Sequence, residues 1–175
     1  PFNLGTAGQT ATFSEGDADY FLNSKVELGA NMGYAATRTL GDYTFTKIQP
    51  QTANASAAAE DYVLFRIQPK PGFTFTPSAA SLVAYKDGTY NGTLTIAFVT
   101  ADGTETTLAT GQAIARNSET PAYTSLAYND LSAVTPVEGA VGLKVYIGGN
   151  LATNKQVGLS NIIIEGTLSG TEKDL

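Results

Sequence analysis

Hydrophobic and polar residues alternate with a period of two along much of this chain. The clearest examples are the segments 61–68, 93–99 and 142–147. In the first segment, an apolar face of valine, phenylalanine and isoleucine alternates with a face that carries Arg66 and Gln68. Successive side chains of a strand point to opposite faces, so this pattern predicts half-buried β-strands.

Weaker versions of the same pattern occur at residues 10–13, 25–28, 43–48, 81–85, 104–109 and 122–128. Residues 161–165 are more uniformly apolar, which is typical of a strand covered on both faces. The dipeptide Asp102-Gly103 separates the strands at 93–99 and 104–109. Because Asp-Gly supplies the positive φ of a tight turn, we expect a hairpin there.

No stretch shows a sustained apolar repeat of 3.6 residues. Residues 53–61 have helix propensity without an apolar stripe, which suits a loop or one short helical turn. About ten short strands with glycine-rich turns predict an all-β fold, a two-sheet antiparallel β-sandwich of the jelly-roll kind. We expect residues 1–170 to form a single module and residues 171–175 to begin a linker.

The composition narrows the chemistry available to this chain. Its 175 residues include no histidine, cysteine or tryptophan, but 9 tyrosines and 8 phenylalanines. Histidine is the side chain best suited to move protons near neutral pH, and cysteine is the commonest thiolate nucleophile. Most hydrolase triads, zinc sites and redox centres are therefore excluded. We expect a binding or scaffolding module that is not an enzyme.

Charge excludes further partners. Only 15% of the residues are charged, and the net charge is -6. This acidic balance argues against nucleic acid and anionic membranes as partners. No apolar run approaches the ~20 residues of a membrane-spanning helix. A surface rich in hydroxyl and amide groups is common on secreted β-proteins, so we expect a protein that is secreted or on a bacterial cell surface. We also expect the module to be monomeric.

Carboxylates alone suffice for glycoside hydrolysis, so we consider that reaction as well. The aspartates next to glycine lie in turn contexts, which do not supply the apolar setting that raises a catalytic carboxyl's pKa: Asp17, Asp42, Asp87 and Asp102. Glu165 is the exception, because it lies within an isoleucine-rich strand. We interpret Glu165 as a side chain on the solvent face of that strand, and the enzyme hypothesis ranks third.

Three acidic residues near the N-terminus suggest a cation site. Glu15, Asp17 and Asp19 have the spacing i, i+2 and i+4, which lets a loop surround a hard cation with oxygen ligands. The segment lacks the rest of an EF-hand loop. We therefore retain two interpretations, a structural Ca²⁺ site and a solvated acidic turn. A thermal melt with millimolar calcium distinguishes them.

Sugar recognition pairs an aromatic face with planar hydrogen-bonding groups. By strand alternation, Arg66, Gln68, Lys144, Tyr146 and Glu165 all point away from the predicted core. If their strands are neighbours, they form a polar groove. We expect Tyr146 to supply the stacking face there and the other four side chains to bind hydroxyls.

A second candidate patch lies in loops. Tyr85 and Tyr90 flank the turn that contains Asp87-Gly88, and Arg116 precedes another polar loop. The alternative for each tyrosine is packing within a strand. The absence of tryptophan, the strongest stacking side chain, moves either site onto tyrosine and hydrogen bonds.

Two stretches carry a resemblance to known proteins. They are residues 61–78, followed by Tyr85-Lys86-Asp87-Gly88-Thr89, and residues 154–166 with their Leu-Ser-Asn-Ile-Ile-Ile-Glu-Gly strand. Together they resemble non-catalytic β-sandwich domains of secreted polysaccharide-degrading enzymes from gut and rumen Bacteroidota, including pectate lyase-like and xylan-active proteins. The closing strand is also similar to that of jelly-roll carbohydrate-binding modules. The resemblance covers roughly residues 40 to 168 and transfers no list of binding residues.

The resemblance implies a jelly-roll module that binds plant cell-wall polysaccharide, of the xylan or pectin type, for a catalytic domain in the same polypeptide. We therefore expect a non-catalytic carbohydrate-binding module. The alternative is a structural spacer or an adhesion-type domain without glycan affinity.

Overall fold

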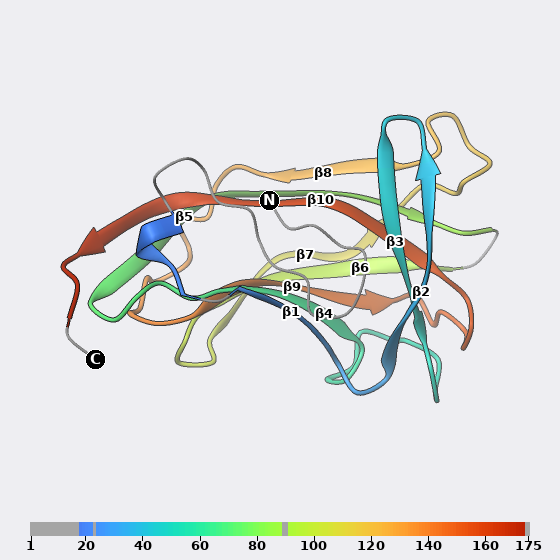
Figure 1. Ribbon diagram of the computed structural model, residues 1–175. Helices are drawn as coiled ribbons and strands as arrows, with labels where there is room; N and C mark the ends of the chain where they lie inside the picture. The colour runs from blue at the N-terminus through green and yellow to red at the C-terminus, as the bar shows by residue number, and fades with distance from the viewer. Residues whose placement is uncertain (1–17, 23, 89–90, 174–175) are drawn as a thin grey trace.

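A computed structural model describes residues 18–22, 24–88 and 91–173. The ten strands in these residues form two antiparallel five-stranded sheets packed face to face, which confirms the predicted all-β sandwich (Figure 1). One short 3-10 helix, η1 (Ala18–Tyr20), precedes the strands. Within the described residues, no helix has the length and apolar character needed to cross a membrane.

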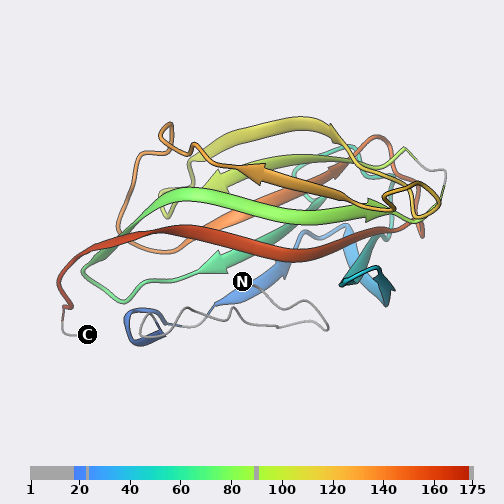
Figure 2. The same cartoon turned by 90° about the horizontal axis from the view of Figure 1, so that it is seen from above.

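The first sheet contains, in spatial order, β1 (Lys25–Leu28), β4 (Tyr62–Ile67), β9 (Val141–Gly148), β6 (Thr93–Val99) and β7 (Glu105–Ala113). The second sheet contains β2 (Met32–Leu40), β3 (Tyr43–Pro50), β10 (Val157–Gly170), β5 (Phe73–Lys86) and β8 (Thr124–Tyr128). Most connections pass from one sheet to the other, which makes the sandwich jelly-roll-like. Figure 2 shows β5 and β10 side by side along the molecule.

The strands differ from the predicted ones chiefly in length. β5 begins at Phe73, eight residues before the predicted start, and continues through Pro77. Pro77 lies opposite Gly166 at a register shift, where an irregular ladder tolerates a residue without an N–H. β2 was not predicted, because its alanines and glycine hide the alternation. The strand expected at 10–13 lies outside the described residues.

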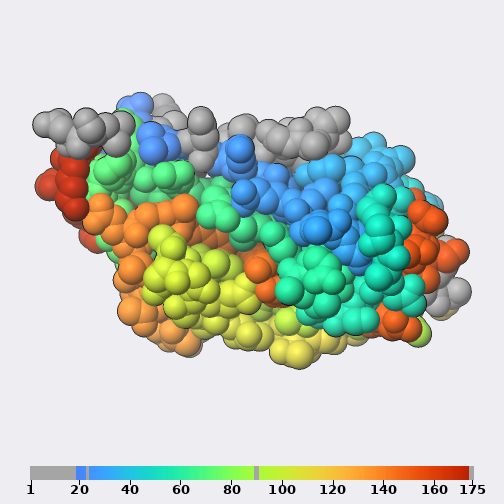
Figure 3. Space-filling view, turned by 90° about the horizontal axis from the view of Figure 1, so that it is seen from below, coloured from blue at the N-terminus to red at the C-terminus, as the bar shows by residue number. Residues whose placement is uncertain are grey.

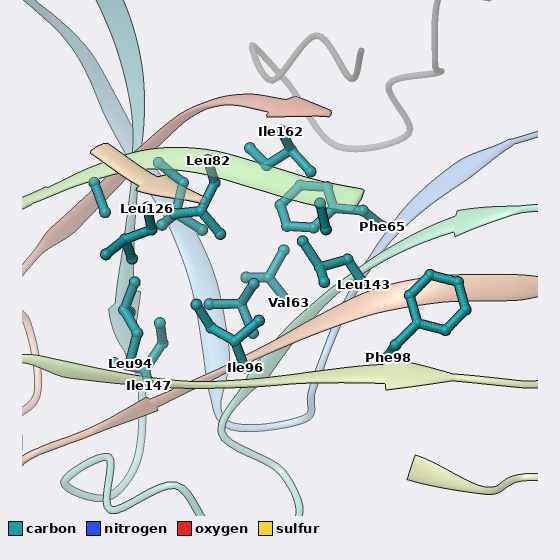
Figure 4. Packing of buried hydrophobic residues seen from close by; sticks show 14 of the residues in the cluster. Val63, Phe65, Leu82, Leu94, Ile96, Phe98, Leu126, Leu143, Ile147 and Ile162 are labelled. Atoms are coloured by element: carbon teal, nitrogen blue, oxygen red, sulfur yellow. The ribbon is translucent and has the colours of Figure 1, made fainter. Parts of the chain in front are cut away.

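The main core lies between the two sheets (Figure 4). Side chains of β4, β6 and β9 meet those of β5, β8 and β10, and the labelled residues are Val63, Phe65, Leu82, Leu94, Ile96, Phe98, Leu126, Leu143, Ile147 and Ile162. The predicted apolar faces therefore point inward, and the polar faces of the same strands are left outside. The hairpin at Asp102-Gly103 is present, with Gly103 at φ 84°.

A smaller cluster lies on the outer face of the second sheet. Phe45, Val83 and Tyr85 are buried there, and Tyr123 packs against them. A Cβ atom at Gly158 would collide with the Tyr85 ring, so glycine is required for this ring to lie across β10. Strand β3, which carries Phe45, forms with β2 the hairpin that stands upright in Figure 1.

A buried polar network joins the two sheets at one end. Asn31, ahead of β2, donates from Nδ2 to Asp61 Oδ1 at 2.7 Å. The backbone N–H groups of Ser56 and Ala58 donate to Asp61 Oδ2 at 2.9 and 3.1 Å. The Asp61 carbonyl accepts from the Ile147 N–H of β9 at 2.7 Å. This network holds the loop before β4 and places Tyr62 beside β9.

The network gives a first prediction. Asp61→Ala leaves the donors of Asn31, Ser56 and Ala58 without this acceptor. Because an unpaired buried donor costs about 1–3 kcal/mol, we expect the free energy of unfolding to fall by about 3–5 kcal/mol. Urea denaturation measures the change. Asp130→Ala, which removes an exposed carboxylate, is the matched control, and a loss no larger than that of the control contradicts the role of Asp61.

Candidate functional site

Four side chains meet on the outer face of the first sheet, and we call them the tyrosine cluster: Tyr62, Tyr146, Lys144 and Glu105. Tyr62 of β4 and Tyr146 of β9 are direct cross-strand partners. Their ring centroids are 6.1 Å apart, and the rings are inclined by 68°. Lys144 Nζ lies 4.4 Å from the centroid of Tyr62 and 4.8 Å from that of Tyr146. Both rings therefore share one cation.

Glu105 joins the cluster from the edge strand β7. Its Oε1 accepts from Lys144 Nζ at 2.7 Å, and the Tyr146 hydroxyl lies 2.7 and 2.9 Å from its two oxygens. Strand β6 lies between β9 and β7, so the Tyr146 ring extends across β6. The β6 residues opposite Tyr146 and Lys144 are the small Thr95 and Ala97, which leave room for it.

The electrostatics of the cluster follow from these contacts. Burial acts against ionisation of Glu105, but hydrogen bonds from Lys144 and Tyr146 outweigh it and hold the Glu105 pKa below its ordinary value. Burial likewise acts to lower the Lys144 pKa, but its bonds to Glu105 and Tyr146 raise it overall. Burial raises the pKa of Tyr146. At neutral pH the cluster contains an ion pair and an uncharged phenol.

Figure 3 shows this face of the molecule. A short strip of orange-red atoms belonging to β9 is visible between the yellow-green β6–β7 turn and the blue-green segment ahead of β4. The side chains of Tyr62, Tyr146 and Lys144 are half-buried, so the cluster presents part of its surface to solvent.

The structure brings only some of the predicted site residues together. Tyr146 and Lys144 are both in the tyrosine cluster. Arg66 shares this face, but it lies four residues along β4 from Tyr62, about 13 Å at strand spacing, and pairs with Glu27. Gln68 follows the end of β4, still farther from the rings.

The structure removes Glu165 from the predicted groove. It lies on β10 in the second sheet, so it is exposed on the opposite side of the sandwich from Tyr146. Strand alternation gives the face of a side chain within its own sheet. It does not identify the sheet to which the strand belongs, and the single groove with Glu165 is wrong for that reason.

The prediction of Tyr85 as an exposed ligand-binding residue is wrong too. Its ring is fully buried and packs edge-on against Phe45, with centroids 4.8 Å apart. Burial raises the pKa of Tyr85 to about 12, and the charge of Asp87 adds to the shift while Arg38 opposes it. Asp87 itself is ion-paired with Arg38 at 2.7 Å.

Of the other loop and metal candidates, the structure describes Arg116 and Asp19, and neither is part of the tyrosine cluster. Arg116 pairs with Glu119 at 3.6 Å in the loop before β8. Tyr90, Glu15 and Asp17 lie outside the described residues, and Asp19 is exposed in η1. The calcium site therefore stays a prediction.

Sequence reasoning missed Tyr62 and Glu105. Tyr62 was within reach, because it shares its face with Leu64 and Arg66 by the same alternation. No local signal identifies Glu105, because its partners are 39 and 41 residues away in the chain. They become neighbours only through the order of strands in the first sheet.

Comparison with known proteins gives no match to a family model or a curated protein, and distant likenesses to solved structures. Among solved structures, the chain is similar to one described as "CBM4 structure and function", with 11% identity and a TM-score of 0.41 over 83% of this chain and 87% of the other.

Two viral proteins show a comparable likeness. The infectious bursal disease virus Gt strain structure has 14% identity and a TM-score of 0.41, over 96% of this chain and 38% of the other. The enzymatically active domain of bacteriophage CBA120 tailspike protein 4 has 12% identity and a TM-score of 0.36, over 82% of this chain and 19% of the other. All three likenesses are too distant to carry an argument about function.

The depressed pKa of Glu105 predicts an acid-sensitive contribution to stability. Because its folded-state pKa lies below the ordinary 4.5, the contribution is complete above about pH 4.5 and is lost as the pH falls through the folded value. We expect Glu105→Gln to cost about 0.5–1 kcal/mol at pH 7 and less in acid.

Urea denaturation between about pH 3 and pH 8 measures this difference. Glu119→Gln, which removes the more exposed pair with Arg116, is the control and should give a smaller difference at pH 7. A cost of Glu105→Gln that stays constant or grows as the pH falls contradicts the assigned network.

Proposed function

We propose that this chain is a non-catalytic carbohydrate-binding module and that the tyrosine cluster is its glycan-contact surface. The observation that carries the proposal is the convergence of two aromatic rings, an ammonium group and a carboxylate on an outer sheet face. Tyrosine rings pack against the C–H surfaces of a pyranose, while Glu105 accepts from sugar hydroxyls and Lys144 donates to them.

The geometry constrains how a sugar would be held. The inclined rings of Tyr62 and Tyr146 form a corner, and Lys144 Nζ occupies the space over both rings. A sugar therefore packs on the ring surface that Lys144 leaves exposed. A hydroxyl both donates and accepts, so it can exchange bonds with Lys144 and Glu105 without leaving either charge unpaired.

The arrangement of carboxylates supports a non-catalytic role. On the strands of this face, Glu27 and Glu105 lie on the two opposite edge strands, β1 and β7. Four strand spacings separate these edges, about 19 Å, whereas paired glycosidase carboxylates are roughly 5–10 Å apart. Each is also held in an ion pair, at 2.8 Å to Arg66 and 2.7 Å to Lys144.

The biological setting is a further part of the proposal. The ligand is a plant cell-wall polysaccharide of the xylan or pectin type, and the module serves a catalytic domain in the same secreted or surface-attached polypeptide. The resemblance of the sequence to accessory domains of polysaccharide-degrading enzymes supports this setting. The low charge content supports it as well. A structural Ca²⁺ at Glu15, Asp17 and Asp19 is proposed on spacing alone.

Affinity electrophoresis against xylan, pectin, β-glucan and mannan tests the function. We expect retardation in at least one gel, and we expect Tyr146→Ala and Tyr62→Ala each to weaken it about tenfold, or ~1.4 kcal/mol. Tyr20→Ala is the matched control, because Tyr20 is an exposed tyrosine on η1, outside the cluster. Its mobility should match that of the unmodified protein.

Two outcomes contradict the proposal in different ways. Unchanged mobility in all four gels refutes glycan binding and favours the spacer or adhesion-type domain. Retardation that survives both tyrosine substitutions retains the glycan-binding function but removes it from the tyrosine cluster.

A further inference from the structure

Two cations on the outer face of the first sheet, Lys144 and Arg66, are already paired with carboxylates. Lys144 bonds to Glu105 at 2.7 Å, and Arg66 bonds to Glu27 at 2.8 Å. The Lys144 side chain is only 18% exposed. An approaching anion therefore meets a cation that is both partly covered and neutralised.

Two further carboxylates lie close to cluster residues in the sequence. Glu60 is exposed two residues before Tyr62, and Asp102 is exposed in the turn that leads to Glu105. Lys25 is the exposed cation of β1, opposite Arg66 rather than Tyr62. It lies more than a Debye length of about 8 Å from the rings, so salt screens its attraction there.

We propose that this face selects neutral glycan chains, such as xylan or methyl-esterified pectin, over the free-acid form of pectin and other polyuronates, and that Glu105 is the residue that sets the selectivity. The inference rests on the proposed function of the same face. A uronate carboxylate that reaches Lys144 must share it with the Glu105 carboxylate, and the two like charges repel. A neutral hydroxyl avoids this repulsion, because it donates to Glu105 while it accepts from Lys144.

Glu105 determines selectivity through the charge it neutralises rather than through shape. Glutamine has nearly the same size and keeps an acceptor oxygen, but it carries no charge. In Glu105→Gln, Lys144 keeps its position over the two rings but loses its counter-charge. The same face then presents an uncompensated ammonium to a polyuronate.

The experiment compares polygalacturonate with fully methyl-esterified polygalacturonate, which has the same backbone without the charge. We expect the unmodified protein to be retarded more by the ester, or by neutral xylan, β-glucan or mannan, than by the free acid. Glu105→Gln should improve binding to polygalacturonate about three- to fivefold relative to the ester, as expected for one partly exposed ion pair. Glu119→Gln, which frees Arg116 in a distant loop, should leave the ratio unchanged.

A second variant tests whether the gain acts through Lys144. In Glu105→Gln/Lys144→Met the uncompensated ammonium is absent, so the gain in polygalacturonate binding should disappear. Thermal melts of each variant verify that the fold is retained.

The possible results separate this inference from the proposed function. Tyr146-dependent binding that favours polygalacturonate over its ester overturns the charge selectivity and leaves the glycan function standing. An unchanged preference in Glu105→Gln also overturns it. Absence of retardation in every gel contradicts both.

Discussion

The hydrogen bonds of the buried Asp61 carboxylate are the interactions on which the rest of this fold depends. The carboxylate accepts hydrogen bonds from Asn31, just ahead of β2, and from the backbone of the loop before β4, and the backbone carbonyl of Asp61 accepts from Ile147 of β9. These contacts tie the second sheet, a long loop and the first sheet together at one end. A buried carboxylate is stable only when it is fully hydrogen-bonded, so the loop has to close around it. Tyr62 is the next residue, and its position beside Tyr146 follows directly from this closure.

The tyrosine cluster in turn depends on small residues and strand order. The Tyr146 ring reaches Glu105 only because β6 presents Thr95 and Ala97 beneath it. On the opposite sheet the Tyr85 ring crosses β10 over Gly158 in a similar way, but it is fully buried against Phe45. Two tyrosines thus extend across a neighbouring strand, and one of them keeps part of its surface exposed. Because Tyr146 is partly exposed whereas Tyr85 is buried, the outer face of the first sheet is the candidate binding surface.

Much of the fold could be predicted from the sequence, because period-two alternation is a local property. It identified β1 and β6 at their observed bounds and placed Lys144 and Tyr146 on an outer face. It failed where the surroundings of a side chain depend on strands that are far apart in the sequence. Glu165 has the expected outward direction but belongs to the other sheet, and Tyr85 is covered by residues of other strands. Glu105 joins Lys144 across β6, a neighbourhood that only strand pairing creates.

The central claim is that a glycan contacts the Tyr62–Tyr146 pair. Protein NMR during titration with neutral xylo-, cello- and manno-hexasaccharides tests it most directly, because ring protons report contact with a sugar residue by residue. We predict that at least one of these sugars perturbs the ring signals of Tyr62 and Tyr146 and the backbone amide of Lys144 before any others. Perturbations confined to the second sheet, or none with any of the three sugars, would contradict the account.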